Sequence, residues 1–334
     1  MWRIVDGVEL SREKYLDRLG LRLDDLDFET NKAQSLNELI AAHLDAVPFE
    51  NIDTYGGGRW ISLDVGDAYE KIVCRRRGGF CYEVNILFCW LLRRLGYDAR
   101  LVMARVYRGT DSSLDSSPAP KDDIRSPQND LWDGENPPTH AAIVVENEYL
   151  CDVGFGEPPR VALELGAQEQ RDGQHAYRFV CTGRLWALER RSRGATGLGG
   201  IRSAPGTWEP RLLFDLDDSR PPAHFEAGLY RVQTNADLIF KQYLFCVRQA
   251  RDAKFVLQGT TLRVTPFYDD DDDDDDELQT ADELRSRRTE STFETPGDLI
   301  AALGRTFGTD IDAADPDEAR CIRLAVDRAF ENNK

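Results

Sequence analysis

The residues best suited to chemistry lie in one short segment, where Cys81 stands behind two glycines. This segment, residues 77–85, reads RGGFCYEVN, and an apolar run with helical spacing follows it. The pattern predicts a loop that turns into a helix with Cys81 in its first turn. Unpaired backbone N–H groups and the positive end of the helix dipole favour a thiolate there, and they can stabilise an oxyanion. Cys81 is therefore a candidate nucleophile.

A buried cysteine can equally be a small apolar core residue, and the segment alone leaves this alternative open. Cys74 and Cys89 are interpreted as core residues of that kind. Cys81 differs from them because the glycines before it allow another group to approach its backbone closely.

A nucleophilic cysteine needs a base, and the chain has only four histidines. His43 lies in a predicted helix, His175 in a polar turn, and His224 after two prolines. His140 is the most informative of the four, because it opens a predicted strand at residues 139–145.

A second predicted strand, residues 149–153, follows a short polar turn, so the two strands are expected to form a hairpin. Pairing Val144 with Glu148 leaves a three-residue loop. The same register places His140 opposite Asp152, with the Cβ atoms roughly 5 Å apart. This arrangement suits a histidine oriented by an aspartate, although a surface cross-strand pair is the alternative.

Cys81, His140 and Asp152 together would form a papain-like Cys–His–Asp triad. At these residues the sequence resembles the arylamine N-acetyltransferases. The resemblance covers nearly the whole chain, strongly to about Pro159 and weakly after it. It rests on residues 15–20, 47–52 and 77–85, on His140, and on residues 151–156.

The resemblance implies an α+β fold in three parts. The expected parts are a helical bundle at residues 1–95 that carries the cysteine, a β-barrel at 96–215 that carries the histidine and aspartate, and an α/β lid at 216–334. A long insertion at 108–138 is expected in the barrel, and an acidic loop at 269–277 in the lid.

The resemblance also implies ping-pong transfer of an acetyl group from acetyl-CoA. Cys81 would take the acetyl group as a thioester and pass it to an arylamine, arylhydrazine or N-arylhydroxylamine. His140 would exchange the protons, and Asp152 would orient it. The positions implied for contact with the coenzyme are Phe155, Gly156 and Phe240.

The chain departs from the family pattern at two places. The family usually has a serine two residues before the phenylalanine at position 240, where this chain has Leu238, and the insertion lies directly before His140. Two alternatives therefore remain. One is another acyl transfer on the same scaffold, such as macrolactam amide synthesis without acetyl-CoA, and the other is a catalytically idle acidic binding protein.

The remaining patterns predict the elements around these residues. Residues 10–90 read as mainly helical, with Gly20 ending the first helix, Ser35 capping the second and Pro48 following it. Glu50 and Arg77 are expected to form a structural ion pair beneath the cysteine loop. Short strands are expected at 100–107, 141–145, 149–153, 176–182, 185–188, 255–257 and 261–264, and late helices at 298–303 and 318–330.

The composition narrows the classes of partner. The 334 residues carry a formal net charge of −18, which repels nucleic acid and anionic membrane surfaces. Such an acidic chain suits a halophilic host whose salt screens carboxylate repulsion. No apolar stretch is long enough to span a bilayer, and no signal-peptide pattern opens the chain.

The cysteine pattern predicts a cytoplasmic protein without a metal. Seven cysteines, an odd number without tight clustering, fit reduced thiols. No CxxC pair and no HExxH motif occurs, so a zinc site has no support. The acidic run at 269–276 lacks the spaced ligands of a calcium loop and is interpreted as a solvated loop.

The charge predicts a salt-dependent fold. The Debye length shrinks from ~10 Å at 0.1 M salt to ~3 Å at 1 M, so KCl should relieve carboxylate repulsion and raise the melting temperature steeply up to a few molar. A KCl titration of the melting temperature tests this. A variant that lacks residues 269–276 is the control and should behave like the wild type. A flat wild-type curve would contradict the halophilic interpretation.

Overall fold

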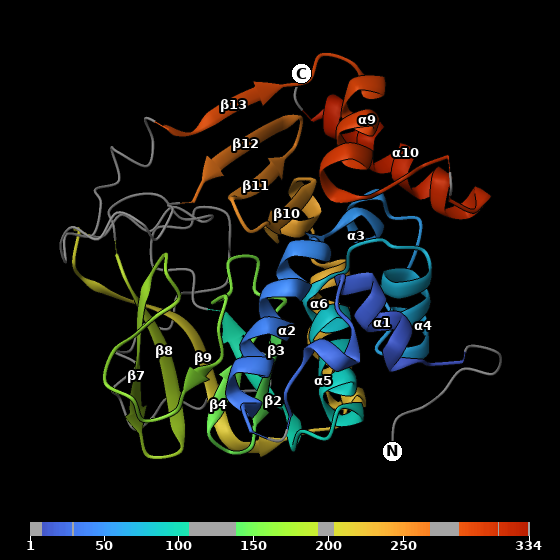
Figure 1. The fold of residues 1–334 in the computed structure, drawn as a ribbon. Coiled ribbons are helices and arrows are strands. Elements are labelled where there is room, and N and C mark those ends of the chain that lie inside the picture. Colours follow the sequence, from blue (N-terminus) through green and yellow to red (C-terminus); the bar gives the residue numbers. More distant parts are fainter. Residues whose placement is uncertain are drawn as a thin grey trace.

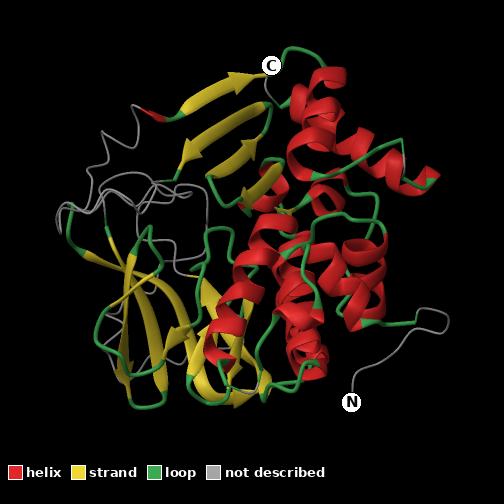
Figure 2. Ribbon diagram, viewed as in Figure 1, coloured by secondary structure: helices red, strands yellow, loops and turns green. Residues whose placement is uncertain are grey.

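The computed structural model confirms an α+β fold, with two antiparallel sheets and two groups of helices (Figures 1 and 2). Helices of the N-terminal half pack beside the larger sheet, and the last two helices pack beside the smaller one. The described residues are 9–28, 30–106, 138–192, 204–267, 287–312 and 314–332.

The N-terminal helices begin and end largely where local sequence signals place them. Ser11 caps the first helix by accepting a hydrogen bond from the Lys14 N–H at 3.1 Å, and Gly20 ends it with a φ of 75°. The helical elements are α1 (Arg12–Leu19), a 3-10 turn (Leu23–Asp25), α2 (Lys32–Ala46), α3 (Ile52–Gly56), α4 (Val65–Tyr69), a π-helical turn (Glu70–Cys74) and α5 (Cys81–Arg94).

The start of α2 corrects one prediction. Asn31, not Ser35, is its N-cap residue, and Ser35 lies one turn inside the helix. The buried Ser35 hydroxyl donates to the Asp27 carbonyl at 2.9 Å. Its hydrogen bond therefore ties the helix to the preceding loop rather than capping it. The helix ends at Ala46, before Pro48, as expected.

The central helix α5 is buried along most of its length. Every residue from Cys81 to Leu92 is buried, so the helix is covered on all sides. Its first turn is closed by Glu83, whose carboxylate accepts a hydrogen bond from the Phe80 N–H at 2.7 Å. The prediction that Cys81 lies in the first turn of this helix is confirmed, since Cys81 is its first residue.

The larger sheet has eight strands and curls round a core of its own. Leu163 and Tyr177, near opposite ends of the strand order, share one hydrophobic cluster with Val144. The strand order is β5 (Leu163–Glu164), β4 (Tyr149–Cys151), β3 (His140–Val145), β2 (Ala99–Val106), β9 (Trp208–Ser219), β8 (Leu185–Arg191), β7 (Ala176–Thr182) and β6 (Gln170–Arg171).

Strand β3 is buried on both faces. Ala141, Ile143 and Val145 pack into the helical core, while Ala142 and Val144 pack into the core of the sheet. This explains its continuous apolar run, which differs from the alternating pattern of a half-exposed strand. A strand fixed on both faces gives its first residue, His140, little freedom to move.

The β3–β4 hairpin exists, but its predicted register is wrong by two residues. Val145 pairs with Tyr149 and Ile143 with Cys151, so the loop comprises residues 146–148. Glu146 and Asn147 both adopt left-handed backbone, with φ of 55° and 56°. A shift of two residues leaves every side chain on its face, so the alternation of side chains did not distinguish the two registers.

The smaller sheet and the last helices form the C-terminal part of the fold. The first strand of this sheet, β1, comes from the N-terminal half of the chain and pairs with β10. The strand order is β1 (Phe49–Glu50), β10 (Phe245–Gln249), β11 (Ala253–Gln258), β12 (Thr261–Pro266) and β13 (Thr289–Thr292). The helical elements are a 3-10 turn (Pro222–Phe225), α6 (Glu226–Thr234), α7 (Ile239–Gln242), α9 (Pro296–Phe307) and α10 (Pro316–Glu331).

The cores cross the predicted part boundaries. Phe225 and Leu229 pack into the N-terminal helical core, whereas Ile52 and Tyr55 of α3 pack with α9 and α10. The division at 1–95, 96–215 and 216–334 stays a prediction. The insertion predicted at 108–138 lies outside the described residues except for Pro138, and the acidic loop at 269–277 lies wholly outside them.

Candidate active site

The cysteine loop is held against β1 by backbone contacts that require glycine. The Gly79 N–H donates to the Pro48 carbonyl at 3.1 Å, and the Glu50 N–H donates to the Gly79 carbonyl at 3.0 Å. A Cβ atom at Gly78 would lie 2.4 Å from the Pro48 oxygen, closer than any real contact allows. This close packing delivers Cys81, which is 6% exposed, as the first residue of α5.

His140 and Asp152 form a direct, buried pair. Their Nε2 and Oδ2 atoms lie 2.5 Å apart, and the two residues are 1% and 5% exposed. In the observed register Asp152 lies one residue beyond β4 and diagonal to His140 rather than opposite it. The predicted contact is present although the predicted register is wrong, because both registers place the two side chains on one face.

Asn85 joins this pair to the helix of Cys81. It lies four residues after Cys81, so the two side chains share a face of α5. Its Nδ2 donates to Asp152 Oδ1 at 3.0 Å and to the Ala141 carbonyl at 2.7 Å, and its Oδ1 accepts from the Val153 N–H at 2.9 Å. Sequence reasoning did not assign this role, although an asparagine within an apolar helical run was a usable signal.

The segment after β4 lies directly on the first turn of α5. A Cβ atom at Gly154 would lie 2.8 Å from the Cys81 carbonyl oxygen and 2.9 Å from Asn85 Nδ2. The Gly154 N–H donates to Asp152 Oδ1 at 2.8 Å. These contacts bring the histidine–aspartate pair to the end of the helix that begins with the cysteine.

Comparison with known proteins decides the family. A family model described as N-acetyltransferase matches residues 32–119 and 124–294. The arylamine N-acetyltransferase of Mycolicibacterium smegmatis is 30% identical over 283 residues, which cover 83% of this chain and 85% of that protein. The chain belongs to the arylamine N-acetyltransferase family.

Two further relatives bear on the chemistry of this family member. The structure of Mycobacterium marinum arylamine N-acetyltransferase in complex with CoA matches it with a TM-score of 0.69 and 25% identity, covering 94% of this chain and 98% of that one. An N-malonyltransferase of Gibberella moniliformis is 28% identical over 319 residues, covering 90% of this chain and 85% of that protein.

The two aromatic residues predicted to contact the coenzyme lie beside His140 and the cysteine loop. Phe155 meets the His140 ring edge-on, with ring centres 6.1 Å apart, and Gly156 follows it with a φ of 87°. Phe240 packs edge-on against Phe80, the residue before the cysteine, at 4.8 Å. The coenzyme contacts of Phe155, Gly156 and Phe240 stay predictions.

Leu238 stands at a helix-capping position, where a serine side chain could accept a hydrogen bond. It is the N-cap residue of α7, with extended backbone, and its side chain is buried in the helical core. A serine there could accept a hydrogen bond from the helix, which leucine cannot. This departure from the family pattern therefore replaces a capping position by apolar packing.

Two other cysteines, Cys89 and Cys74, and the helical histidine His43 lie in environments that differ from the site. Cys89 is fully buried, and burial raises the pKa of its thiol to about 12. Cys74 is exposed, so its interpretation as a core cysteine is wrong: it ends the π-helical turn at the surface. Burial lowers the pKa of His43 to about 3, and its Nδ1 lies 3.0 Å from the Tyr15 hydroxyl.

A buried charge network lies beneath the cysteine loop and confirms the predicted Glu50–Arg77 pair. Arg77 contacts Glu50 through Nη2, and through Nη1 it contacts Asp53 at 3.1 Å and Glu318 of α10 at 2.9 Å. Lys71 contacts Asp53 at 2.7 Å and also reaches Glu83 and Glu50, at 3.0 and 3.6 Å.

The network sets the charges of its members. Burial alone would lower the pKa of Lys71, but Asp53 and Glu50 raise it above its usual range. Burial would raise the pKa of Asp53, yet Lys71 and Arg77 hold it well below its usual range. Lys71 and Asp53 therefore stay charged in a region that excludes water.

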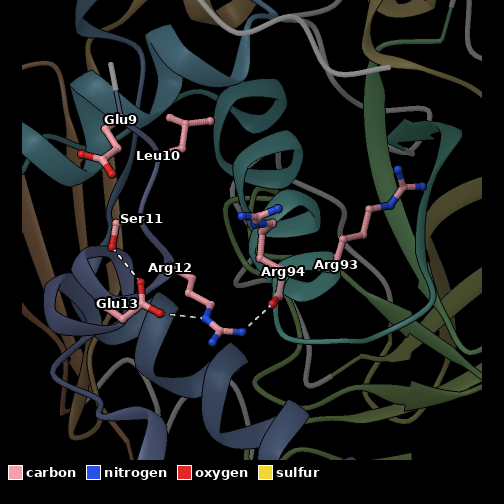
Figure 3. A pocket seen from close by; sticks show the side chains of 7 residues that line it. All are labelled: Glu9, Leu10, Ser11, Arg12, Glu13, Arg93 and Arg94. Atoms are coloured by element: carbon pink, nitrogen blue, oxygen red, sulfur yellow. Dashed lines mark hydrogen bonds and ion pairs between the residues drawn. The ribbon is translucent and has the colours of Figure 1, made fainter. Parts of the chain in front are cut away.

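None of the helices among the described residues is long and apolar enough to cross a membrane, and these residues contain no group of three or more histidine, cysteine, aspartate or glutamate residues that could hold a metal. A surface hollow of about 510 Å³ lies at the far end of α5, roughly 20 Å from Cys81, beside Arg93 and Arg94 (Figure 3). There Arg12 donates hydrogen bonds to the Arg94 carbonyl and to the Glu13 carboxylate.

Replacing Asp152 by asparagine should lower turnover by roughly two or more orders of magnitude without unfolding the protein. An amide Nδ2 facing His140 Nε2 would donate to it and move the imidazole proton to Nδ1. Steady-state rates and the melting temperature check this. Asp172→Asn is the matched control, because Asp172 also lies near a histidine, with its Oδ1 3.9 Å from His175 Nδ1. Turnover of Asp152→Asn within about threefold of the wild type would contradict the assigned role.

Replacing Glu50 by glutamine should destabilise the fold by up to ~3–5 kcal/mol, because Arg77 loses one of its three buried counter-charges and keeps those of Asp53 and Glu318. Glutamine keeps the acceptor for the Ile52 N–H but not the charge. Urea unfolding measures the loss, and activity should fall with it. Glu290→Gln breaks the half-exposed pair with Arg263 and should cost little. An unchanged unfolding midpoint for Glu50→Gln would show that the network does not depend on this charge.

Proposed function

We propose that this chain transfers an acetyl group from acetyl-CoA to an arylamine, arylhydrazine or N-arylhydroxylamine. The observation that carries the proposal is the His140–Asp152 pair, held by Asn85 against the helix that begins with Cys81. Membership of the family and the CoA complex of the Mycobacterium marinum relative support acetyl-CoA as the donor substrate.

In the proposed reaction Cys81 is the nucleophile. Its thiolate attacks the thioester carbonyl of acetyl-CoA, and the CoA sulfur leaves with the bonding electron pair and takes a proton from His140. The amine of the acceptor then attacks the acetyl-cysteine and releases the Cys81 thiolate, while His140 takes the amine proton. Two half-reactions that share one thioester give ping-pong kinetics.

The protein groups around the cysteine suit these steps. Asp152 engages Nε2 of His140, so Nδ1 is the nitrogen that would exchange protons with Cys81. A buried aspartate stabilises the imidazolium and with it a neighbouring thiolate. Because Cys81 begins α5, the first backbone N–H groups of the helix would lie near the carbonyl oxygen of the bound acyl group, which gains negative charge in both half-reactions.

A second candidate is transfer of a different acyl group by the same residues. The N-malonyltransferase relative, which this chain covers over 85% of its length, favours this possibility. Amide synthesis without a CoA thioester remains a further alternative on the same scaffold.

Incubation with acetyl-CoA should add one acetyl mass to the peptide that contains Cys81, and an arylamine should remove it. Intact-mass and peptide mass spectrometry measure both steps. Cys81→Ala should abolish the adduct, whereas the exposed control Cys74→Ala and the buried control Cys89→Ala should keep it. A normally acetylated Cys81→Ala protein would refute the mechanism, and an adduct from malonyl-CoA alone would favour the second candidate.

A further inference from the structure

A second buried charge cluster lies behind the loop that carries Phe155. The carboxylate of Glu157 faces three cations from three different strands. Lys254 of β11 contacts its Oε1, Arg190 of β8 lies 3.2 Å from its Oε2, and Arg211 of β9 lies 3.6 Å from the same oxygen. Lys254 is partly exposed, and the other three side chains are no more than 8% exposed.

Arg211 is poorly satisfied in this cluster. Its 3.6 Å contact with Glu157 is too long for a hydrogen bond, and its buried Nε has no hydrogen-bond partner among the described residues. Burial, helped by the charge of Arg190, lowers the pKa of Arg211 to about 10. A guanidinium has five N–H donors, and a buried donor without an acceptor is costly.

The cluster also has an unbalanced charge. Glu209, two residues before Arg211 on β9, adds a second buried carboxylate whose Oε1 lacks a partner among the described residues. Glu209 lies opposite Arg190 in the β8–β9 pairing, and its charge acts on Arg190 and Arg211. Two carboxylates therefore face three cations, a local positive excess in a chain with a formal charge of −18. One additional carboxylate would neutralise the cluster.

The unsatisfied guanidinium lies close to the proposed reaction. Its central carbon is 5.3 Å from the centre of the Phe155 ring, and that ring meets the His140 ring at 6.1 Å. The Phe155 ring thus connects Arg211 to the imidazole of His140. A planar guanidinium whose Nε lacks an acceptor matches a carboxylate in shape and charge, which suits it to recognise that group near His140.

We propose that Arg211 forms a subsite for a substrate carboxylate, backed by Arg190 and Lys254. This rests on the proposed function, because the carboxylate is carried either by the acyl group of the donor or by the aromatic acceptor. A malonyl group is an acyl group of this class, and one relative is named an N-malonyltransferase. Glu209 on the same strand disfavours a second anion, so the subsite takes one carboxylate.

Arg211→Met tests the subsite in two arms. The acceptor arm compares 4-aminobenzoate with the neutral 4-aminobenzamide, using acetyl-CoA. The donor arm compares malonyl-CoA with acetyl-CoA, using 4-aminobenzamide. In the arm that uses the subsite, kcat/KM for the carboxylate member should fall about 10- to 100-fold, and the neutral member should change by less than about twofold. The arm that responds identifies the source of the carboxylate.

The matched control is Arg178→Met. Arg178 also stacks on an aromatic ring, with its guanidinium carbon 4.5 Å from the Trp208 ring centre, and it pairs with Glu189 at 2.6 Å. It should change neither arm. Arg211→Lys, which keeps the charge, should restore part of the preference. Equal losses for charged and neutral members, or no loss in either arm, would overturn the proposal and leave Arg211 a purely structural residue.

Failure of the proposed function would be recognised separately. If the wild type forms no acetyl-cysteine, the acyl-transfer proposal fails, and calorimetry with benzoate, malonate and neutral benzamide then decides the subsite. The wild type should bind benzoate or malonate at least tenfold more tightly than Arg211→Met does. The two proteins should have the same affinity for benzamide. If the wild type binds neither benzoate nor malonate, or if Arg211→Met binds them as tightly as the wild type does, the subsite proposal is overturned.

Discussion

The buried network round Arg77 is the constraint on which the rest of the site depends. One guanidinium contacts β1, α3 and α10 at once, through Glu50, Asp53 and Glu318. Burying these charges is costly, and only mutual pairing offsets that cost. The same network includes Glu83 in the first turn of α5, which holds the Phe80 N–H. The C-terminal helix therefore helps to fix the backbone on both sides of the cysteine loop.

The site is assembled between two elements that have little freedom to move. Helix α5 is buried along most of its length, and strand β3 is buried on both faces. Asn85 bridges them, and glycine at 154 allows the segment after Asp152 to lie against the first turn of the helix. Preorganisation of this kind lets a histidine and an aspartate keep their geometry without reorganising during a reaction.

The loop that carries Phe155 is held from two sides. Asn85 holds its start at the Val153 N–H, and Glu157 holds its end through cations of the larger and of the smaller sheet. Phe155 lies between these fixed points, with His140 on one side and Arg211 on the other. Charge pairing thus fixes the loop that carries Phe155, as the Arg77 network fixes the cysteine loop. It leaves the guanidinium of Arg211 available for a ligand.

The sequence by itself determined the glycine stop at Gly20, the place of Cys81 in the first turn of α5 and about half of the described strands. These follow from capping, periodicity and turn chemistry, which act within a few residues. The predicted Glu50–Arg77 pair joins residues that are 27 positions apart, and the structure confirms it. Only the tertiary structure decided the hairpin register, the exposure of Cys74 and the role of Asn85. A two-residue register shift preserves every face, and burial or bridging depends on elements that are distant in sequence but adjacent in space. The Arg211 cluster has the same origin, because its charges come from three strands and one loop that no local pattern connects.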